Sequence, residues 1–204
     1  RNFGIGADGR IVLITDELND FRMKYFNSNG KEGTMCGNGG RCIVAFARQL
    51  GLISDRTKFS GIDGGHKGFI RHDGMIELQM IDVPSVEKLE DGYLLETGST
   101  HFVVFTASVN KKDVFNEGQR IRYQKRFGDT GTNVNFVEIL NDGHLKIRTY
   151  ERGVENETLA CGTGAVASAI SSCLKEETDK NSYTIEAKGG KLEVRFQRNS
   201  KDQF

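Results

Sequence analysis

The stretch MCGNGGR at residues 35–41 places a cysteine before a glycine-rich turn, which leads into the apolar run CIVAFARQL. A second stretch, ACGTGA at residues 160–165, has the same order and leads into the apolar run VASAISSCL. Glycine lets the backbone turn tightly, and a helix that starts there leaves its first N–H groups unpaired. The pattern predicts two largely buried helices, at residues 41–50 and 164–174.

The segments around the two cysteines follow the same order. When Cys36 is aligned with Cys161, the strand-like FRMKYFNSNG falls where LKIRTYERG does, and Ile11-Val12 meets Phe136-Val137. Each half therefore consists of strand, strand, turn, cysteine and helix. This shared order favours an internal duplication over two chance CG dipeptides.

Segments with β-branched, aromatic and alternating residues indicate strands between and after these helices. They are FRMKYFN, MIELQMI, HFVVFTA, NVNFVEI, LKIRTYE, YTIEA and KLEVRF. The predicted fold is α/β (α+β), with two pseudo-symmetric halves that each wrap a mixed or antiparallel sheet around a central helix. The single proline, Pro84, lies in a polar connection, so we expect one half at residues 1–87 and the other at 88–204.

The composition points to a small-molecule partner. Basic and acidic residues balance at 28 each, so no net charge favours nucleic acid or an anionic membrane. No apolar run approaches the roughly 20 residues of a membrane-spanning helix, and residues 1–10 contain no apolar signal core. We expect a cytoplasmic protein that binds neither nucleic acid nor a membrane.

The four cysteines are too few for a disulfide framework, and they lack the close pairs of a structural zinc site. Reduced thiols and no metal are therefore expected. Cys173 and Cys42 lie in apolar helical runs, where a buried hydrophobic role is expected. His66, His72 and His144 lie in turn-like sequence, where exposure is expected. Cys36 and Cys161 differ from the other two thiols because glycine follows each directly.

A thiol at a helix start can take part in acid–base chemistry. The positive end of the helix dipole binds carboxylate or phosphate, and it lowers the pKa of a cysteine from about 8.5 towards neutrality. If the halves face each other, one thiolate removes a proton from a carbon beside a carboxylate and the other thiol returns one to the opposite face. Helix-end N–H groups would stabilise the developing enolate. This chemistry requires no metal or organic cofactor.

Three other interpretations compete with this one. Either CG motif alone is most often a turn with a buried thiol. A phosphate-binding loop is weaker, because neither motif ends in the GKS or GKT that supplies lysine and a magnesium-binding hydroxyl. A disulfide or redox pair would suit two facing cysteines, but no CxxC is present.

The sequence resembles the diaminopimelate epimerases, which interconvert LL- and meso-diaminopimelate without a cofactor in lysine and peptidoglycan-precursor synthesis. The resemblance spans nearly the whole chain, in family order. It rests on FGIGADG at 3–9, YFNSNG at 25–30, MCGNGGRC at 35–42, GTNVNFVE at 131–138, YERGVENETLACGTGA at 150–165 and GGKLEV at 189–194.

The resemblance implies a role for each matching residue. Cys36 and Cys161 would be the catalytic acid and base, with His101 and Glu151 tuning their protonation. The substrate contacts implied by the same motifs are Asn27, Gly37, Asn38, Ser99, Asn133, Glu151, Arg152, Gly162 and Thr163. Backbone donors after each cysteine would hold the reacting carboxylate, and Arg152 would clamp the distal one. The resemblance is also compatible with a homodimer.

The sequence departs from the family pattern at three places. The family's opening strand, with a substrate asparagine, would precede this sequence, and its closing strand is cut short at Phe204. TGSTH at 97–101 stands where a GNPH-like segment is typical. Ser99 therefore replaces a substrate asparagine with a shorter hydrogen-bonding group, which bears on the strength of binding more than on the chemistry.

Two rival functions remain open. A proline or hydroxyproline racemase of the same superfold is disfavoured by Asn38, because those relatives tend to have histidine there. A non-catalytic carboxylate-binding or thiol-redox protein is the rival from another class. It is suggested by Ser99 and by the family's opening strand, which this sequence does not include. Exchange of solvent deuterium into substrate separates all three.

Overall fold

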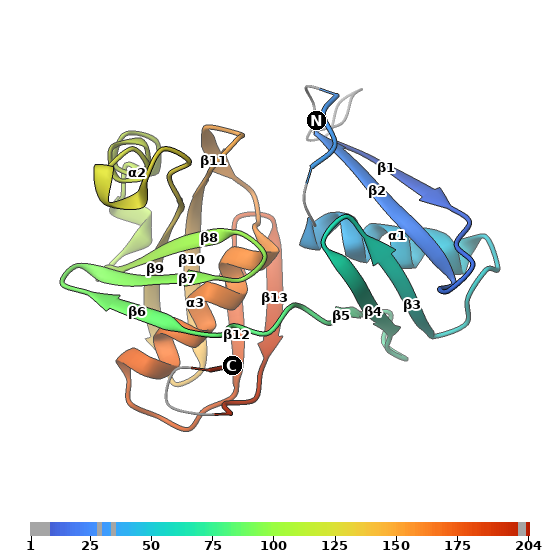
Figure 1. Cartoon of the computed structure of the whole chain (residues 1–204). Helices are drawn as coiled ribbons and strands as arrows, with labels where there is room; N and C mark the ends of the chain where they lie inside the picture. The colour runs from blue at the N-terminus through green and yellow to red at the C-terminus, as the bar shows by residue number, and fades with distance from the viewer. Residues whose placement is uncertain (1–8, 28–29, 34–35, 200–202) are drawn as a thin grey trace. The chain divides into compact units, whose positions relative to one another are not determined.

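The computed structural model describes residues 9–27, 30–33, 36–199 and 203–204. The chain divides into two compact units, Arg1–Met80 and Ile81–Phe204 (Figure 1). Residues 3–8 of the FGIGADG motif, residues 28–29 of YFNSNG and Met35 lie outside the described residues. Each unit has its own sheet with a helix packed against it, which confirms the predicted fold class; α3 (Gly162–Lys175) is largely buried as predicted, whereas α1 (Gly37–Gln49) is buried on one face only.

The sheet of the first unit has the strand order β1-β2-β3-β4-β5. The pairs are antiparallel except β2 with β3, which is parallel. The elements are β1 (Gly9–Ile14), β2 (Phe21–Asn27), α1 (Gly37–Gln49), β3 (Arg56–Gly61), β4 (Gly64–Ile70) and β5 (Ile76–Leu78). Helix α1 is the crossover that a parallel pair requires.

Helix α1 packs on this sheet through one apolar face. Ile43, Val44 and Ala47 recur at helical spacing and are buried against a cluster that includes Phe21 and Phe59. The rings of Phe21 and Phe59 stack with their centroids 5.1 Å apart. Burial of this face holds the start of α1, and with it Cys36, at one end of the sheet.

The sheet of the second unit has the strand order β13-β12-β10-β9-β8-β7-β6, and β11 pairs with β10. Pairs β8–β9 and β10–β12 are parallel and the others antiparallel. The strands are β6 (Val86–Leu89), β7 (Gly92–Glu96), β8 (Thr100–Phe105), β9 (Asn133–Asn141), β10 (His144–Glu151), β11 (Asn156–Thr158), β12 (Ser182–Ala187) and β13 (Gly190–Arg195). The helices are α2 (Val114–Arg122) and α3 (Gly162–Lys175), with short 3-10 turns at Val109–Lys111 and Lys125–Phe127.

The two faces of this sheet pack against different helices (Figure 1). Val103, Val137 and Ile147 belong to the core that contains α3, whereas Phe102 and Val134 belong to the core that contains α2. Because side chains alternate along a strand, His101 in β8, Asn135 in β9 and Thr149 in β10 share the α3 face. That face carries the polar residues described below.

The chain order repeats between the units. In the first unit an antiparallel pair (β1, β2) is followed by α1, by a strand parallel to β2, and by its antiparallel partner β4. In the second unit β9, β10, α3, β12 and β13 repeat this arrangement. The topology therefore agrees with the duplication inferred from the two CG motifs.

Three local features differ from expectation. The boundary expected between residues 87 and 88 falls inside β6, whose pairing with β7 joins it to the second unit. Both cysteine-linked helices begin earlier than expected, at Gly37 and Gly162, because their glycines form the first helical turn. Helix α2 was not expected, since its sequence VFNEGQRIR is short and mostly polar.

The predictions for Cys42 and His66 were wrong. Cys42 is exposed because the buried face of α1 is formed by Ile43, Val44 and Ala47. His66 is buried in β4, with its ring near Phe59 and its Nε2 2.9 Å from Asp63 Oδ1. Cys173 is buried in the α3 core, as predicted.

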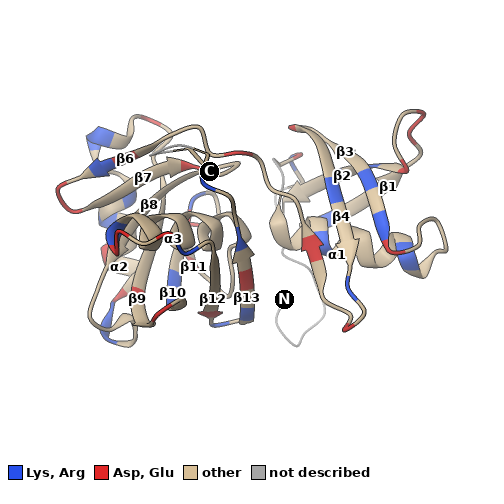
Figure 2. Ribbon diagram, turned by 90° about the horizontal axis from the view of Figure 1, so that it is seen from below, with Lys and Arg blue, Asp and Glu red and all other residues tan. Residues whose placement is uncertain are grey.

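Figure 2 shows basic and acidic residues distributed over strands and loops of both units. Basic and acidic residues, which are equal in number, therefore occur in both units. No helix among the described residues is long and apolar enough to cross a membrane.

Candidate active site

Cys36 and Cys161 occupy the same position in two different helices. Cys36 is the N-cap of α1 with φ −106° and ψ 115°, and Cys161 is the N-cap of α3 with φ −122° and ψ 115°. Each sulfur accepts the backbone N–H three residues later, Gly39 N–H in one unit and Gly164 N–H in the other, at 3.4 Å in both. The side chains thus replace the serine or aspartate that usually caps a helix.

These helix starts are suited to an anionic ligand. The first N–H groups of a helix have no intrahelical acceptor, and the dipole adds positive potential there. Neither helix carries an acidic residue in its first turn, and each carries a basic residue in its last turn, Arg48 and Lys175. A carboxylate could therefore bind beside either sulfur, where the same field favours a thiolate.

His101 approaches Cys161 through a hydroxyl group. The His101 side chain is fully buried in β8, and its Nε2 lies 2.8 Å from Thr163 Oγ1. Thr163 Oγ1 in turn lies 3.3 Å from Cys161 Sγ. Burial, reinforced by the charge of Arg152, lowers the pKa of His101 from 6.5 to about 3. The imidazole is therefore neutral at neutral pH and influences the thiol as a dipole rather than as a cation.

Ser99, Asn133 and Arg152 form a polar cluster beside this arrangement. Asn133 Oδ1 accepts the backbone N–H of Arg152 at 2.8 Å, and its Nδ2 donates to Ser99 Oγ at 2.8 Å. The Arg152 guanidinium donates to Ser99 Oγ at 3.3 Å and to Gly131 O at 3.4 Å. Both guanidinium contacts are long and therefore weak, which leaves Arg152 able to turn towards a carboxylate.

Glu151 ends β10 and pairs in register with Asn156 of β11. Burial raises the pKa of Glu151 above its ordinary value. The Cα of Asn133 lies in register with that of His101 in the neighbouring strand, so the polar cluster and His101 lie at the same end of the sheet. The second unit thus brings together Ser99, His101, Asn133, Glu151, Arg152, Cys161, Gly162 and Thr163.

The remaining predicted site residues lie in the first unit with Cys36. Asn27 ends β2 and is exposed; its backbone N–H donates to Lys31 O at 2.9 Å. Gly37 is buried at the first position of α1. Asn38 is exposed, and its Oδ1 accepts from Arg41 Nη2 at 2.5 Å.

Sequence reasoning missed three buried polar residues on the α3 face, Thr97, Asn135 and Thr149. Thr97 Oγ1 donates to the backbone carbonyl of Thr163 at 3.0 Å. Alternation in NVNFVEI could have placed Asn135 on the same face as Asn133. The partners of Asn135 depend on strand register, which local sequence does not contain.

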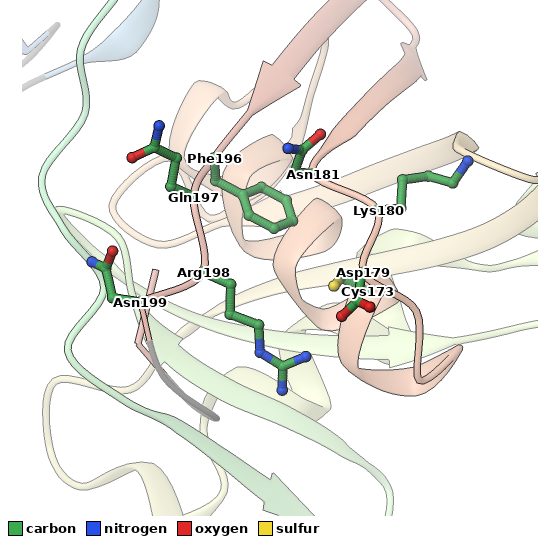
Figure 3. Close-up of a pocket in the computed structure, with 8 residues that line it drawn as sticks. All are labelled: Cys173, Asp179, Lys180, Asn181, Phe196, Gln197, Arg198 and Asn199. Atoms are coloured by element: carbon green, nitrogen blue, oxygen red, sulfur yellow. The ribbon is translucent and has the colours of Figure 1, made fainter.

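A separate cavity lies at the other end of α3. It has a volume of about 470 Å³, and Cys173, Lys180, Phe196 and Arg198 are among the residues that line it (Figure 3). Cys173 Sγ donates to Thr178 O at 3.1 Å. Within the described part of the chain, no group of three or more His, Cys, Asp or Glu side chains could hold a metal ion.

Solved structures define the class of fold. A PhzF-family phenazine biosynthesis protein from Bacillus anthracis superimposes with a TM-score of 0.75 at 14% identity, covering 98% of this chain and 80% of that one. A hydroxyproline epimerase from Agrobacterium vitis, with bound trans-4-hydroxy-L-proline, gives a TM-score of 0.71 at 16% identity, covering 94% and 68%. The chain has the fold that these two kinds of protein share.

Sequence comparison then identifies the family. The family model described as diaminopimelate epimerase matches residues 1–80 and 93–203. The diaminopimelate epimerase of Flavobacterium psychrophilum is 50% identical over 196 residues, 96% of this chain and 77% of that protein. That of Aquifex aeolicus is 38% identical over 213 residues, 98% of this chain and 76% of that protein. The chain belongs to the diaminopimelate epimerase family, a family of isomerases.

Proposed function

We propose that this chain interconverts LL- and meso-diaminopimelate, with Cys36 and Cys161 as the two acid–base groups. The observation that carries the proposal is the matched N-cap geometry of the two cysteines. Family membership supports the substrate, since the relatives at 50% and 38% identity carry this name. The known role of such an enzyme is in lysine and peptidoglycan-precursor synthesis.

In the proposed step one thiolate takes the proton from the α carbon of the substrate and becomes a thiol. The other thiol gives its proton to the opposite face of that carbon and becomes a thiolate. The electron pair of the broken C–H bond resides in the enolate of the adjacent carboxylate until the new C–H bond forms. Because neither a metal nor an organic cofactor takes part, the backbone donors at Gly37, Asn38, Gly162 and Thr163 must stabilise that charge.

The Ser99, Asn133 and Arg152 cluster is suited to the distal amino-acid group of diaminopimelate. Arginine can bind a carboxylate through two parallel hydrogen bonds, and asparagine and serine oxygens can accept from an ammonium group. Asn27 and Asn38 would add contacts from the first unit, and Glu151, with its pKa raised, would share a proton near the reacting centre. Apart from Ser99, which replaces the asparagine of the family motif, these assignments follow the family motifs residue by residue.

The test is exchange in heavy water. The protein is expected to introduce solvent deuterium at the α carbon of diaminopimelate and to interconvert its two isomers. Cys36→Ala and Cys161→Ala are each expected to lower interconversion by about 10²–10⁴-fold or more, the usual contribution of a general acid or base. Cys42→Ala is the matched control, since Cys42 is exposed on α1 and is expected to leave the rate unchanged.

Failure to exchange with intact, reduced protein would contradict the proposal. Exchange into proline or hydroxyproline in place of diaminopimelate would assign the chain to the rival reaction. Retained interconversion in both cysteine variants would show that the thiols have another role.

We also propose a homodimer, which the same resemblance supports, and a cytoplasmic location. Sedimentation of the purified chain tests the oligomeric state, and fractionation of cells that express it tests the location. A monomer at all concentrations, or recovery with the membrane fraction, would contradict this part.

A further inference from the structure

A line of buried polar side chains runs from the middle of the second sheet to the sulfur of Cys161. Thr149 Oγ1 lies 2.9 Å from Asn135 Oδ1, and Asn135 Nδ2 lies 2.8 Å from His101 Nδ1. His101 Nε2 lies 2.8 Å from Thr163 Oγ1, which lies 3.3 Å from Cys161 Sγ. All five side chains are at least nine-tenths buried, so these groups must satisfy one another.

The donor and the acceptor of each hydrogen bond in this line follow from the chemistry of the side chains. An amide nitrogen only donates hydrogen bonds, so Asn135 Nδ2 donates to His101 Nδ1, which must be unprotonated. A neutral imidazole carries its one hydrogen on the other nitrogen, and Nε2–H therefore donates to Thr163 Oγ1. That oxygen has a single hydrogen of its own, which is left to point at Cys161 Sγ.

The Asn135 amide oxygen has two neighbours, and Gly164 is the one that selects this orientation, because a threonine hydroxyl can either donate or accept. The Thr149 hydroxyl donates to Oδ1. On the other side, Oδ1 lies so close to Gly164 that an added Cβ there would overlap it, and the Cα–H of a glycine can face an oxygen favourably. With the amide reversed, its NH2 group would face that Cα–H instead.

We propose that Asn135 is a positioning residue for Cys161. By selecting the His101 tautomer with hydrogen on Nε2, it turns the hydroxyl hydrogen of Thr163 towards the sulfur and stabilises Cys161 as the thiolate. The inference rests on the proposed function only in taking Cys161 as a proton-transfer group.

The two units carry different side chains after each capping cysteine. The residue two positions after Cys36 is Asn38, and its Oδ1 accepts from Arg41 Nη2 at 2.5 Å. The corresponding position after Cys161 is Thr163, whose hydroxyl lies against both His101 and the sulfur. The duplicated units therefore share the capping geometry and differ in the side chain at this position.

The tautomer can be read directly from the wild-type chain by NMR of imidazole-¹⁵N-labelled protein. The His101 signal is assigned by its loss in His101→Gln. The expected result is an unprotonated Nδ1 and a protonated Nε2 at neutral pH. A protonated Nδ1 would overturn the proposal without any variant having to fold. In Asn135→Leu, which removes the donor at similar volume, the preference for the Nε2–H form is expected to weaken.

Alkylation by iodoacetamide measures the consequence at the sulfur. For each variant, the alkylation rate of Cys161 at about pH 7 is divided by its alkylation rate at a pH well above the ordinary thiol pKa of about 8.5. This ratio cancels differences in the access of iodoacetamide to the sulfur. Peptide mass spectrometry separates Cys161 from Cys36. Thr163→Val, which keeps the shape but loses the hydroxyl, is expected to lower this ratio about tenfold at Cys161, because a thiolate loses one charge-assisted hydrogen bond.

Thr163→Ser is the matched variant that keeps the hydroxyl, and it is expected to retain most of the ratio. The Cys36 ratio is expected to stay constant in all variants and serves as the internal control. An unchanged Cys161 ratio in Thr163→Val, or an equal fall in Thr163→Ser, would overturn the proposal. Neither measurement uses diaminopimelate, so an absence of epimerisation would refute the proposed function and leave this result standing.

Discussion

Cys36 and Cys161 cap two different helices with nearly the same backbone conformation, and each sulfur accepts the N–H group three residues later at 3.4 Å. In each helix the residue that supplies this N–H is glycine, Gly39 in α1 and Gly164 in α3. The surroundings of the two glycines differ, and that difference predicts different tolerance to substitution.

Gly164→Ala is expected to destabilise the protein, whereas Gly39→Ala is expected to be tolerated. A methyl group at Gly164 would overlap Asn135 Oδ1, but one at Gly39 would first meet the Cys36 side chain at an ordinary 3.4 Å. Overpacking of this kind costs about 1–3 kcal/mol, while alanine in a helix gains about 0.5–1 kcal/mol over glycine. Urea unfolding of the two variants checks this, and equal stabilities would contradict the packing around Asn135.

Stability is expected to fall as the pH drops below 6.5, the ordinary value for histidine. The pKa of His101 is about 3 in the folded chain, so the unfolded chain binds a proton between these values that the folded chain does not. The contribution of neutral His101 to the free energy of unfolding is complete above pH 6.5 and is lost progressively as the pH falls towards 3. The slope is about 1.4 kcal/mol per pH unit for one such group.

Urea unfolding of wild type and His101→Gln, compared between pH 6.5 and 4.5, isolates this contribution because the carboxylates, including Glu151 with its raised pKa, titrate in both proteins and cancel in the comparison. The wild type is expected to lose more stability than the variant over this interval. Parallel pH profiles would mean that His101 is protonated in the folded chain.

The Arg122–Glu155 pair is expected to stabilise the turn that leads into Asn133. Arg122 Nε lies 2.9 Å from both carboxylate oxygens of Glu155, and Nη1 donates to Thr130 O at 2.9 Å. Glu155 itself has a positive φ of 56°, which a non-glycine residue adopts only when held. Lysine cannot reproduce this fork of donors.

Arg122→Lys is therefore expected to lower the free energy of unfolding by about 1–2 kcal/mol, less than for a fully buried pair because Glu155 is partly exposed. Thermal unfolding measures the loss. Lys180→Arg is the control, since Lys180 forms a surface ion pair with exposed Asp142 and should tolerate the change. A loss no larger than in this control would show that the fork contributes nothing.

Ser99 is expected to affect substrate binding rather than the chemical step. Its Oγ accepts from Asn133 Nδ2 and from Arg152 Nη2, so it orients two side chains assigned to the distal group of the substrate. Ser99→Ala removes two hydrogen bonds of about 1 kcal/mol each, which corresponds to a rise in KM of up to roughly thirtyfold with kcat little changed. Ser99→Thr keeps the hydroxyl and is expected to retain most of the binding. A fall in kcat with constant KM would contradict this role.

The two cysteine helix starts and the duplication could be predicted because their signals are local. A cysteine before glycine and an apolar run specifies a helix start wherever the chain places it, and the order of segments around each cysteine is visible in the sequence. Strands such as FRMKYFN could be located for the same reason, since their alternation lies within a few residues.

Other elements carried too little local signal. Helix α2 is polar and short, and it is stabilised by packing of Val114 and Ile121 against strands β9 and β10. Strand β6 has only four residues, two of them exposed, and is defined by its partner β7. Segments of this kind become helix or strand through contacts that are distant in sequence.

The sequence by itself determined that Cys36 and Cys161 begin helices, because glycines and apolar runs act over a few residues. Only the tertiary structure decided which groups surround each thiol. Asn135, His101 and Thr149 come from three strands, and the register of β8, β9 and β10 places them on one face below the start of α3. Hydrogen-bond direction depends on such neighbours in space, which is why Asn135 looked like an ordinary strand residue until the sheet was assembled.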